Sequence, residues 1–76
     1  MGGKLMQFTT TDSFDEVVDF YNEALNEYDP EFLSHRSELG RQTAISIPQK
    51  NGIISVAIQE FTEEGTVNIT FMAVGG

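Results

Sequence analysis

The chain has 76 residues, 39% of them hydrophobic, and a formal net charge of −8. A chain of this length buries only about 60% of the surface that its unfolded form exposes, so most large apolar side chains are needed in the core. The negative charge and the presence of only four Lys or Arg residues disfavour binding to nucleic acid and to anionic membrane surfaces. The absence of cysteine excludes disulfides and thiolate metal sites. No apolar stretch is long enough for a membrane span, so we expect no direct membrane insertion.

We expect residues 1–76 to form a single domain, with a monomer as the expected oligomeric state. Glycine pairs stand close to both ends, at Gly2-Gly3 and Gly75-Gly76. Such pairs are typical of linkers and of segments added during cloning. Two interpretations therefore stay open, a complete small protein and a module taken from a longer one.

Residues 5–10 are expected to form a short strand, with Met6 and Phe8 on the same face because alternate residues of a strand share a face. The clearest signal follows it, an amphipathic helix. Ser13 and Glu16 have the spacing of a capping box, and Asp12 is an alternative cap. The ring of Pro30 should end the helix at the preceding residue. At about 100° per residue the apolar side chains form one stripe, which we expect to pack on a sheet: Phe14, Val17, Val18, Tyr21, Ala24, Leu25 and Tyr28.

After the helix the apolar residues alternate with a period of two, which indicates strands. Asn51-Gly52 is a strong hairpin signal, and a two-residue turn there pairs Ile47 with Val56. A second turn near Glu64-Gly65, with either two or four loop residues, keeps the apolar side chains on one face. The face toward the helix should then consist of Ile45, Ile47, Ile54, Val56, Ile58, Val67, Ile69, Phe71 and Ala73.

Residues 32–39 form the weakest predicted strand, and this ambiguity suits an edge position. Either of two alternating sets could face the helix: Phe32, Ser34 and Arg36, or Leu33, His35 and Ser37. The expected fold is α+β, in the order β-α-β-β-β-β, with one amphipathic helix packed on one face of a five-stranded antiparallel sheet. The helix runs back from the first strand, so the first strand is antiparallel to the last one if the two are neighbours. The strand order 2-3-4-5-1 then makes the whole sheet antiparallel, and we expect this order.

The sequence predicts no catalytic residue, no metal site and no cofactor. The acidic cluster Asp12, Asp15, Glu16 and Asp19 falls on positions from which side chains radiate, and it lacks the loop that converges oxygens on Ca²⁺. His35 is the single histidine, and no nucleophile motif accompanies it. We therefore expect a non-enzymatic protein.

Glu60 is the acid whose register turns it toward the helix-covered face. We expect it at the rim of the helix, either reaching water or pairing with Arg41 or Thr43. The alternative is a functional carboxylate with a perturbed pKa.

The opposite face of the predicted sheet is small and nearly free of charge, which suits covering by another domain or a partner protein. The candidate interaction face consists of Ala44, Ser46, Ser55, Ala57, Gln59, Thr70 and Met72, with Ile53, Phe61 and Val74 at its margins. The expected function is an accessory or protein-interaction domain, and the competing interpretation is a solvated Ser/Thr-rich face. A small-molecule site between helix and sheet, near Tyr21, Tyr28 and Phe71, is the alternative function.

Residues 8–21 contain the pattern TT-x-DS-x-DEVV-x-FY, and four strands are predicted after it. This arrangement resembles a group of small uncharacterised bacterial domains in which such a helix start precedes a β-meander, often within lipoproteins and other envelope proteins. Their topology is similar to half of the TATA-binding-protein-like fold. The resemblance implies an extracytoplasmic location for a full-length protein. It carries over no functional residue, because each matched residue has a capping or core role.

Overall fold

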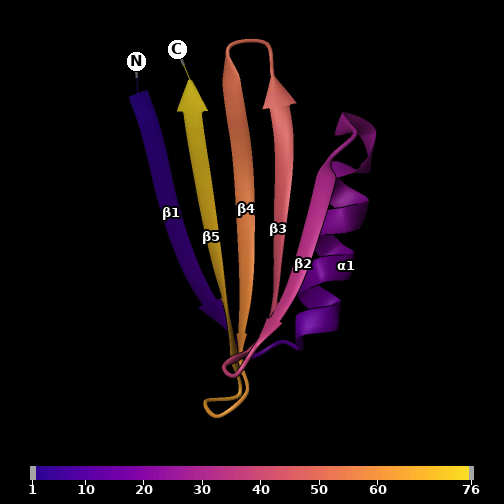
Figure 1. Ribbon diagram of the computed structural model, residues 1–76, viewed down its shortest axis with the longest axis vertical. Helices are drawn as coiled ribbons and strands as arrows, with labels where there is room; N and C mark the ends of the chain where they lie inside the picture. Colours follow the sequence, from indigo (N-terminus) through magenta and orange to yellow (C-terminus); the bar gives the residue numbers. More distant parts are fainter. Residues whose placement is uncertain (1, 76) are drawn as a thin grey trace.

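A computed structural model, which describes residues 2–75, contains one helix and one five-stranded antiparallel sheet (Figure 1). The elements are β1 Gly2–Thr10, α1 Phe14–Leu25 with a 3₁₀ turn at Asn26–Tyr28, β2 Glu31–Ser37, β3 Gly40–Gln49, β4 Gly52–Phe61 and β5 Thr66–Gly75. The strands lie in the order β1-β5-β4-β3-β2, and every neighbouring pair is antiparallel. The predicted fold class and strand order are confirmed. Met1 and Gly76, the first and last residues of the predicted domain, lie outside the described residues.

The start of α1 follows the predicted capping box. The backbone amide of Glu16 donates to Ser13 Oγ at 3.2 Å, and the Ser13 hydroxyl donates to Glu16 Oε1 at 3.1 Å. The amide of Val17 donates to the Ser13 carbonyl at 3.1 Å, which closes the first turn. Ser13 is therefore the cap, and Asp12 is free to take another orientation.

The end of the helix agrees with the prediction at Asp29 but is tighter than expected. The α-helix stops at Leu25, a 3₁₀ turn follows, and Asp29 takes a left-handed conformation with φ of 51° directly before Pro30. Tyr28 lies in this 3₁₀ turn and is exposed, and Ala24, in the last turn of α1, is exposed as well. The predicted stripe was wrong at these two positions, whereas its other members are buried or half-buried.

The core lies between α1 and the central strands. Phe14 and Val17 pack with Ile45, Val56, Ile58, Val67 and Ile69, and the half-buried Val18, Tyr21, Leu25 and Phe71 surround them. All nine side chains predicted to face the helix are buried or half-buried. Thr43 is also buried on this face, and its hydroxyl is 3.2 Å from the hydroxyl of Ser34.

The first hairpin differs from the prediction by two residues. Gln49 pairs with Gly52, so the turn residues are Lys50 and Asn51, and Ile47 pairs with Ile54 rather than with Val56. The reason lies in β5, because a Cβ atom on Gly52 would collide with the carbonyl of Val74. Gly52 is needed where two backbones approach closely, not inside the turn. A shift of two residues preserves the faces, which is why the predicted core survives.

The second hairpin has the four-residue loop, one of the two predicted alternatives. Phe61 pairs with Thr66, and the amide of Gly65 donates to the Phe61 carbonyl at 2.9 Å. Gly65 has a φ of 68°, which a residue without Cβ adopts at little cost.

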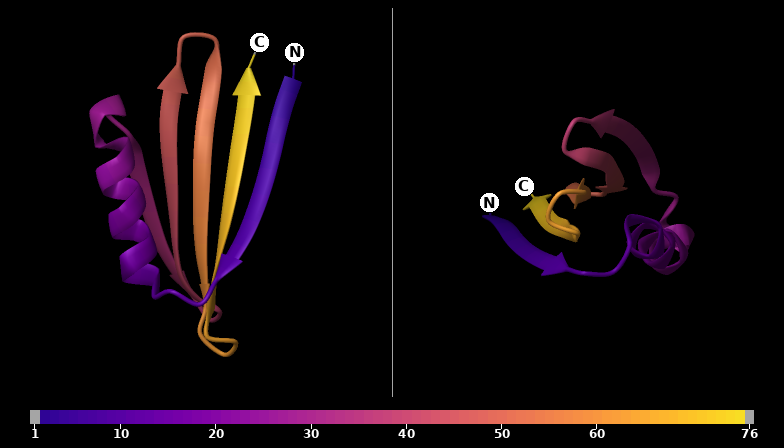
Figure 2. Two further views of the ribbon diagram at one scale, coloured as in Figure 1. Left: turned by 180° about the vertical axis from the view of Figure 1, so that it is seen from behind. Right: turned by 90° about the horizontal axis from the view of Figure 1, so that it is seen from below.

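Strand β2 lies at the edge, as expected, and Phe32, Ser34 and Arg36 share the face of the helix because they pair with Ile45, Thr43 and Arg41. Every residue of β2 is nevertheless exposed. A 12-residue helix is about 18 Å long and a 10-residue strand about 33 Å, so one helix cannot cover the inner face. Figure 2 shows the sheet curling around the helix, with both edge strands at the margins. Inner-face side chains on these edges, such as Met6 and Phe8, stay half-exposed.

Candidate functional site

The outer, convex face of the sheet brings together the seven residues of the candidate interaction face. Ala57 pairs with Ala44 on one side and Thr70 on the other. The next row joins Ser55 to Ser46 and Met72, and Gln59 lies beside Ala57 one position along the same face of β4. Helix α1 lies on the opposite face (Figure 2), and no element within residues 2–75 covers this one.

The outer face of the three central strands carries no charged side chain. Its outward residues are Gln42, Ala44, Ser46 and Pro48 on β3, Ile53, Ser55, Ala57, Gln59 and Phe61 on β4, and Thr66, Asn68, Thr70, Met72 and Val74 on β5. Burying a charged side chain under a partner carries a large desolvation cost. A partner that covered the outer face of these three strands would bury no charged side chain of the domain. Most acidic residues lie on α1 and in the turns, and the exposed Glu31 of the edge strand β2 borders this face beside Ser46.

Four apolar side chains gather at one end of this face, and we call them the outer apolar cluster. Leu5 pairs with Met72, and Ile53 pairs with Val74. Their exposed fractions are 67% for Leu5, 45% for Met72, 40% for Ile53 and 51% for Val74. Leu5 was not among the residues predicted for this face, although its place directly before the inward Met6 pointed to the opposite side of the strand. The cluster is the most apolar part of the uncharged face.

Glu60 lies at the rim of the helix and pairs with Arg41, one of the two partners predicted for it. Arg41 Nε is 3.2 Å from Glu60 Oε1, and the backbone amide of Arg41 donates to the same oxygen at 3.0 Å. The hydrogen bonds from the Arg41 side chain and amide lower the pKa of Glu60, and the Glu60 carboxylate raises the pKa of Arg41. Both carboxylate oxygens of Glu60 accept hydrogen bonds from Arg41, so the pair ties β4 to β3. A lowered pKa does not suit Glu60 to the role of a general acid.

The same guanidinium also holds the start of the helix. Arg41 Nη1 is 3.0 Å from Asp15 Oδ1, and the guanidinium carbon lies 4.7 Å from the centre of the Phe14 ring. Arg41 therefore joins β3, β4 and the first turn of α1.

The other polar residues considered in the sequence do not converge. His35 is exposed on the outward side of β2, opposite Gln42. Among residues 2–75, no group of three or more His, Asp or Glu side chains is placed to hold a metal ion. In the same part of the chain no helix is long and apolar enough to cross a membrane.

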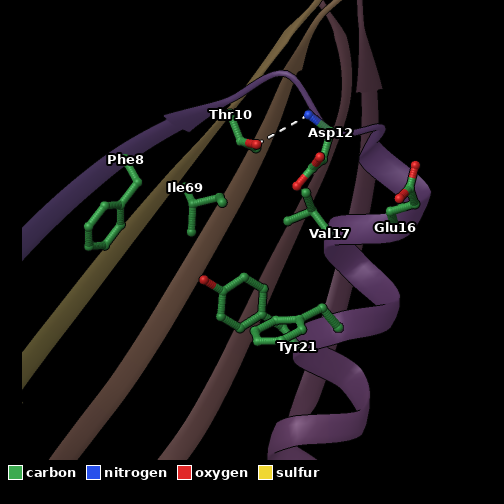
Figure 3. Close-up of a pocket in the computed structure, with 8 residues that line it drawn as sticks. Phe8, Thr10, Asp12, Glu16, Val17, Tyr21 and Ile69 are labelled. Atoms are coloured by element: carbon green, nitrogen blue, oxygen red, sulfur yellow. Dashed lines mark hydrogen bonds between the residues drawn. The ribbon is translucent and has the colours of Figure 1, made fainter.

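An open hollow of about 490 Å³ lies between β1 and α1. Its walls are Phe8, Thr10, Asp12, Glu16, Val17, Phe20, Tyr21 and Ile69, as Figure 3 shows. Of the three residues expected near a small-molecule site, Tyr21 lines the hollow, and the Phe71 ring lies 5.4 Å behind it. Tyr28 does not line the hollow, because it lies in the 3₁₀ turn and is exposed to solvent. Phe8 lies on the same face as Met6, as predicted, and its place in the hollow follows from its pairing with Ile69, a register that the sequence did not specify.

Comparison with known proteins gives no match to this chain, whether with family models, with curated proteins or with solved structures.

Proposed function

We propose that this domain is a non-enzymatic interaction module that binds a partner protein through the outer face of its sheet. The observation that carries the proposal is the uncharged surface of β3, β4 and β5, with the outer apolar cluster at one end. Protein interfaces have a desolvated apolar centre that is poor in charge, and this face has that composition before any partner binds. The acidic helix lies on the other face and keeps the free domain soluble.

The proposal includes kinship with the small bacterial envelope domains that share the pattern of residues 8–21. In that setting the outer face would contact another domain of the same protein or a neighbouring protein. The strand–helix–meander order supports this kinship at the level of architecture.

The test is quantitative affinity capture by the folded domain, with a charge placed at the centre of the face. Ala57→Lys and Ser46→Glu should each abolish partner binding, because a charge would be buried without a counter-charge. Capture of the same partner at unchanged yield by both variants would place the interface elsewhere.

Asn22→Lys is the matched control, since it adds the same charge as Ala57→Lys at an exposed position of α1. It should leave partner binding unchanged. Circular dichroism of all three variants separates loss of binding from loss of fold.

A second candidate function is binding of a small molecule in the hollow between β1 and α1. Its volume of about 490 Å³ and its mainly apolar walls are typical of ligand sites. An NMR screen of apolar fragments tests it, and shifts confined to Phe8, Val17, Tyr21 and Ile69 are the expected result. A library that perturbs none of these residues would rule out the second function.

A further inference from the structure

Three aromatic side chains line the hollow between β1 and α1, namely Phe8, Phe20 and Tyr21, and Phe71 links two of them from outside its walls. The Phe20 and Tyr21 rings meet edge to face with centres 5.1 Å apart, and Tyr21 meets Phe71 at 5.4 Å. Phe8 completes the chain, because its ring lies 6.0 Å from that of Phe71 at 85°. Tyr21 and Phe8 thus each contact Phe71, whereas Phe20 is 64% exposed at the margin of the hollow. Rings already in contact lose less conformational freedom on binding, which lowers the entropic cost.

The carboxylate of Asp12 points into the hollow, above Val17 and Tyr21 (Figure 3). Its orientation has a local cause: the Asp12 amide donates to Thr10 Oγ1 at 3.1 Å, which folds the segment between β1 and α1 over the opening. Because Ser13 caps the helix, the Asp12 carboxylate is not used for that purpose. Glu16 also lines the rim, but its carboxylate accepts the hydrogen bond from Ser13 and lies on the side of the helix away from the rings (Figure 3).

No positive side chain among the described residues neutralises this mouth. No Lys or Arg within residues 2–75 lines the hollow. Arg41, the β3 residue that contacts the helix start, is already paired with Asp15 and Glu60. The Tyr21 hydroxyl faces the hollow opposite Phe8 and has no hydrogen-bond partner within residues 2–75. Partial burial of Tyr21 raises its pKa, so the hydroxyl stays neutral and able to donate or accept.

Aromatic walls combined with the carboxylate of Asp12, unpaired within residues 2–75, select a particular ligand chemistry. Anions are repelled, and Mg²⁺ or Ca²⁺ would need several converging oxygens that apolar walls cannot supply. A quaternary ammonium group is weakly hydrated, is attracted to aromatic rings and is complementary to a carboxylate. We propose that the hollow between β1 and α1 binds a small organic cation carrying a quaternary ammonium group. This inference narrows the second candidate function and is independent of the outer face.

The experiment titrates the isotope-labelled 76-residue protein with choline and, in parallel, with 3,3-dimethylbutan-1-ol, its neutral counterpart of the same shape. Choline should shift the resonances of Phe8, Asp12, Phe20 and Tyr21, and it should bind at least about tenfold more tightly than the alcohol, as expected for one well-placed charge. Equal binding of both probes at these residues would support a small-molecule site but contradict its preference for a quaternary ammonium group. Absence of choline binding, or shifts at other residues, would also overturn it.

Two variants test the roles of the residues. Asp12→Asn keeps the amide that donates to Thr10 and should weaken choline binding about tenfold without changing the affinity for the alcohol. Asp19→Asn removes the same charge from an exposed position of α1 outside the hollow, and it should leave choline binding unchanged. Equal effects of the two variants would reduce the interaction to general charge attraction and contradict a built site.

Discussion

The Arg41 guanidinium and the Glu60 carboxylate form the link by which the sheet holds the beginning of the helix. Arg41 Nε lies 3.2 Å from Glu60 Oε1, and Arg41 Nη2 lies 3.3 Å from Glu60 Oε2, so the pair is bidentate. Because the same guanidinium reaches Asp15, one strand residue connects two strands and a helix. The Glu60 side chain is only 19% exposed, which shields the pair from solvent more than an ordinary surface ion pair.

Glu60→Gln should lower the melting temperature near neutral pH. Arg41 lowers the pKa of Glu60 in the folded state below its ordinary value of 4.5. A depressed folded-state pKa stabilises the fold above the unfolded-state pKa, and this stabilisation is lost as the pH falls through the folded-state value. Thermal melts from pH 7 to pH 2 should therefore show the two proteins converging below a pH of about 4.5. A constant difference across that range would contradict the ion-pair interpretation.

Asp15→Asn tests the second ion pair of Arg41, the one that its guanidinium forms with Asp15 of α1. The Asp15 side chain is 75% exposed, and exposed ion pairs contribute little. Its melting temperature should change less than that of Glu60→Gln, and the change should diminish in high salt. A larger effect at Asp15 would mean that the helix contact, not the strand contact, dominates.

Ser13→Ala should destabilise the domain by about 1 kcal/mol, because the amide of Glu16 loses its acceptor. For a domain of this size that corresponds to a decrease of about 4–8 °C in melting temperature. Ser13→Asp keeps a capping oxygen and should restore most of the loss. Chemical denaturation of the three proteins measures the effect, and equal stability of Ser13→Ala and the natural protein would show that the cap is dispensable.

Ile45→Ala should cost about 2–5 kcal/mol, since Ile45 is fully buried beneath the helix and a cavity would remain. Small domains have little stability in reserve, so we expect extensive unfolding at 37 °C. Ile53→Ala is the matched control, because Ile53 lies on the outer face of β4 and is 40% exposed. Urea denaturation monitored by circular dichroism should separate the two variants clearly. Similar losses would mean that the outer face is already covered in the free domain.

Gly52→Ala should destabilise by about 1–3 kcal/mol, the usual range for overpacking, because the new methyl group meets the carbonyl of Val74. Gly75→Ala is the comparison, since a Cβ there meets nothing closer than an ordinary contact at 3.6 Å. Hydrogen exchange should increase at the paired ends of β4 and β5 in the first variant alone. Unchanged exchange in Gly52→Ala would contradict the close approach that explains the register of the first hairpin.

Residues whose roles depend on neighbours along the chain were predictable. Ser13 and Glu16 specify the helix start, and alternation specifies the inward side chains of β3, β4 and β5. The Asn51-Gly52 dipeptide led to the wrong register for the first hairpin. Gly52 is required by the close approach of the Val74 carbonyl, a group distant in sequence, and not by the turn. Tyr28 was missed for a different reason, because a local 3₁₀ turn over Asn26–Tyr28 interrupts the helical periodicity. Long-range packing decides the position of Gly52, and a local change of helix type decides that of Tyr28.

The candidate interaction face was predictable as a set, because side chains two apart on adjacent strands share a face. The hollow was only partly predictable. The strand order placed β1 beside β5, but it did not specify the register between them, on which the position of Phe8 depends. The orientation of Asp12 comes from a local hydrogen bond to Thr10 that the helix-capping pattern does not predict. Tyr21 could be anticipated from the helix stripe, whereas Phe8 and Asp12 could not be assigned to a common site.

The central claim is that the outer sheet face binds a protein, and site-specific photo-crosslinking tests it most directly. A photoreactive amino acid is placed in turn at Ala57 and Ser46 on the outer face, and at Asn22 on the exposed side of α1. Our account predicts one shared partner crosslinked from Ala57 and Ser46, and none from Asn22. Crosslinking of a partner from Asn22, with none from either outer-face position, would contradict the account.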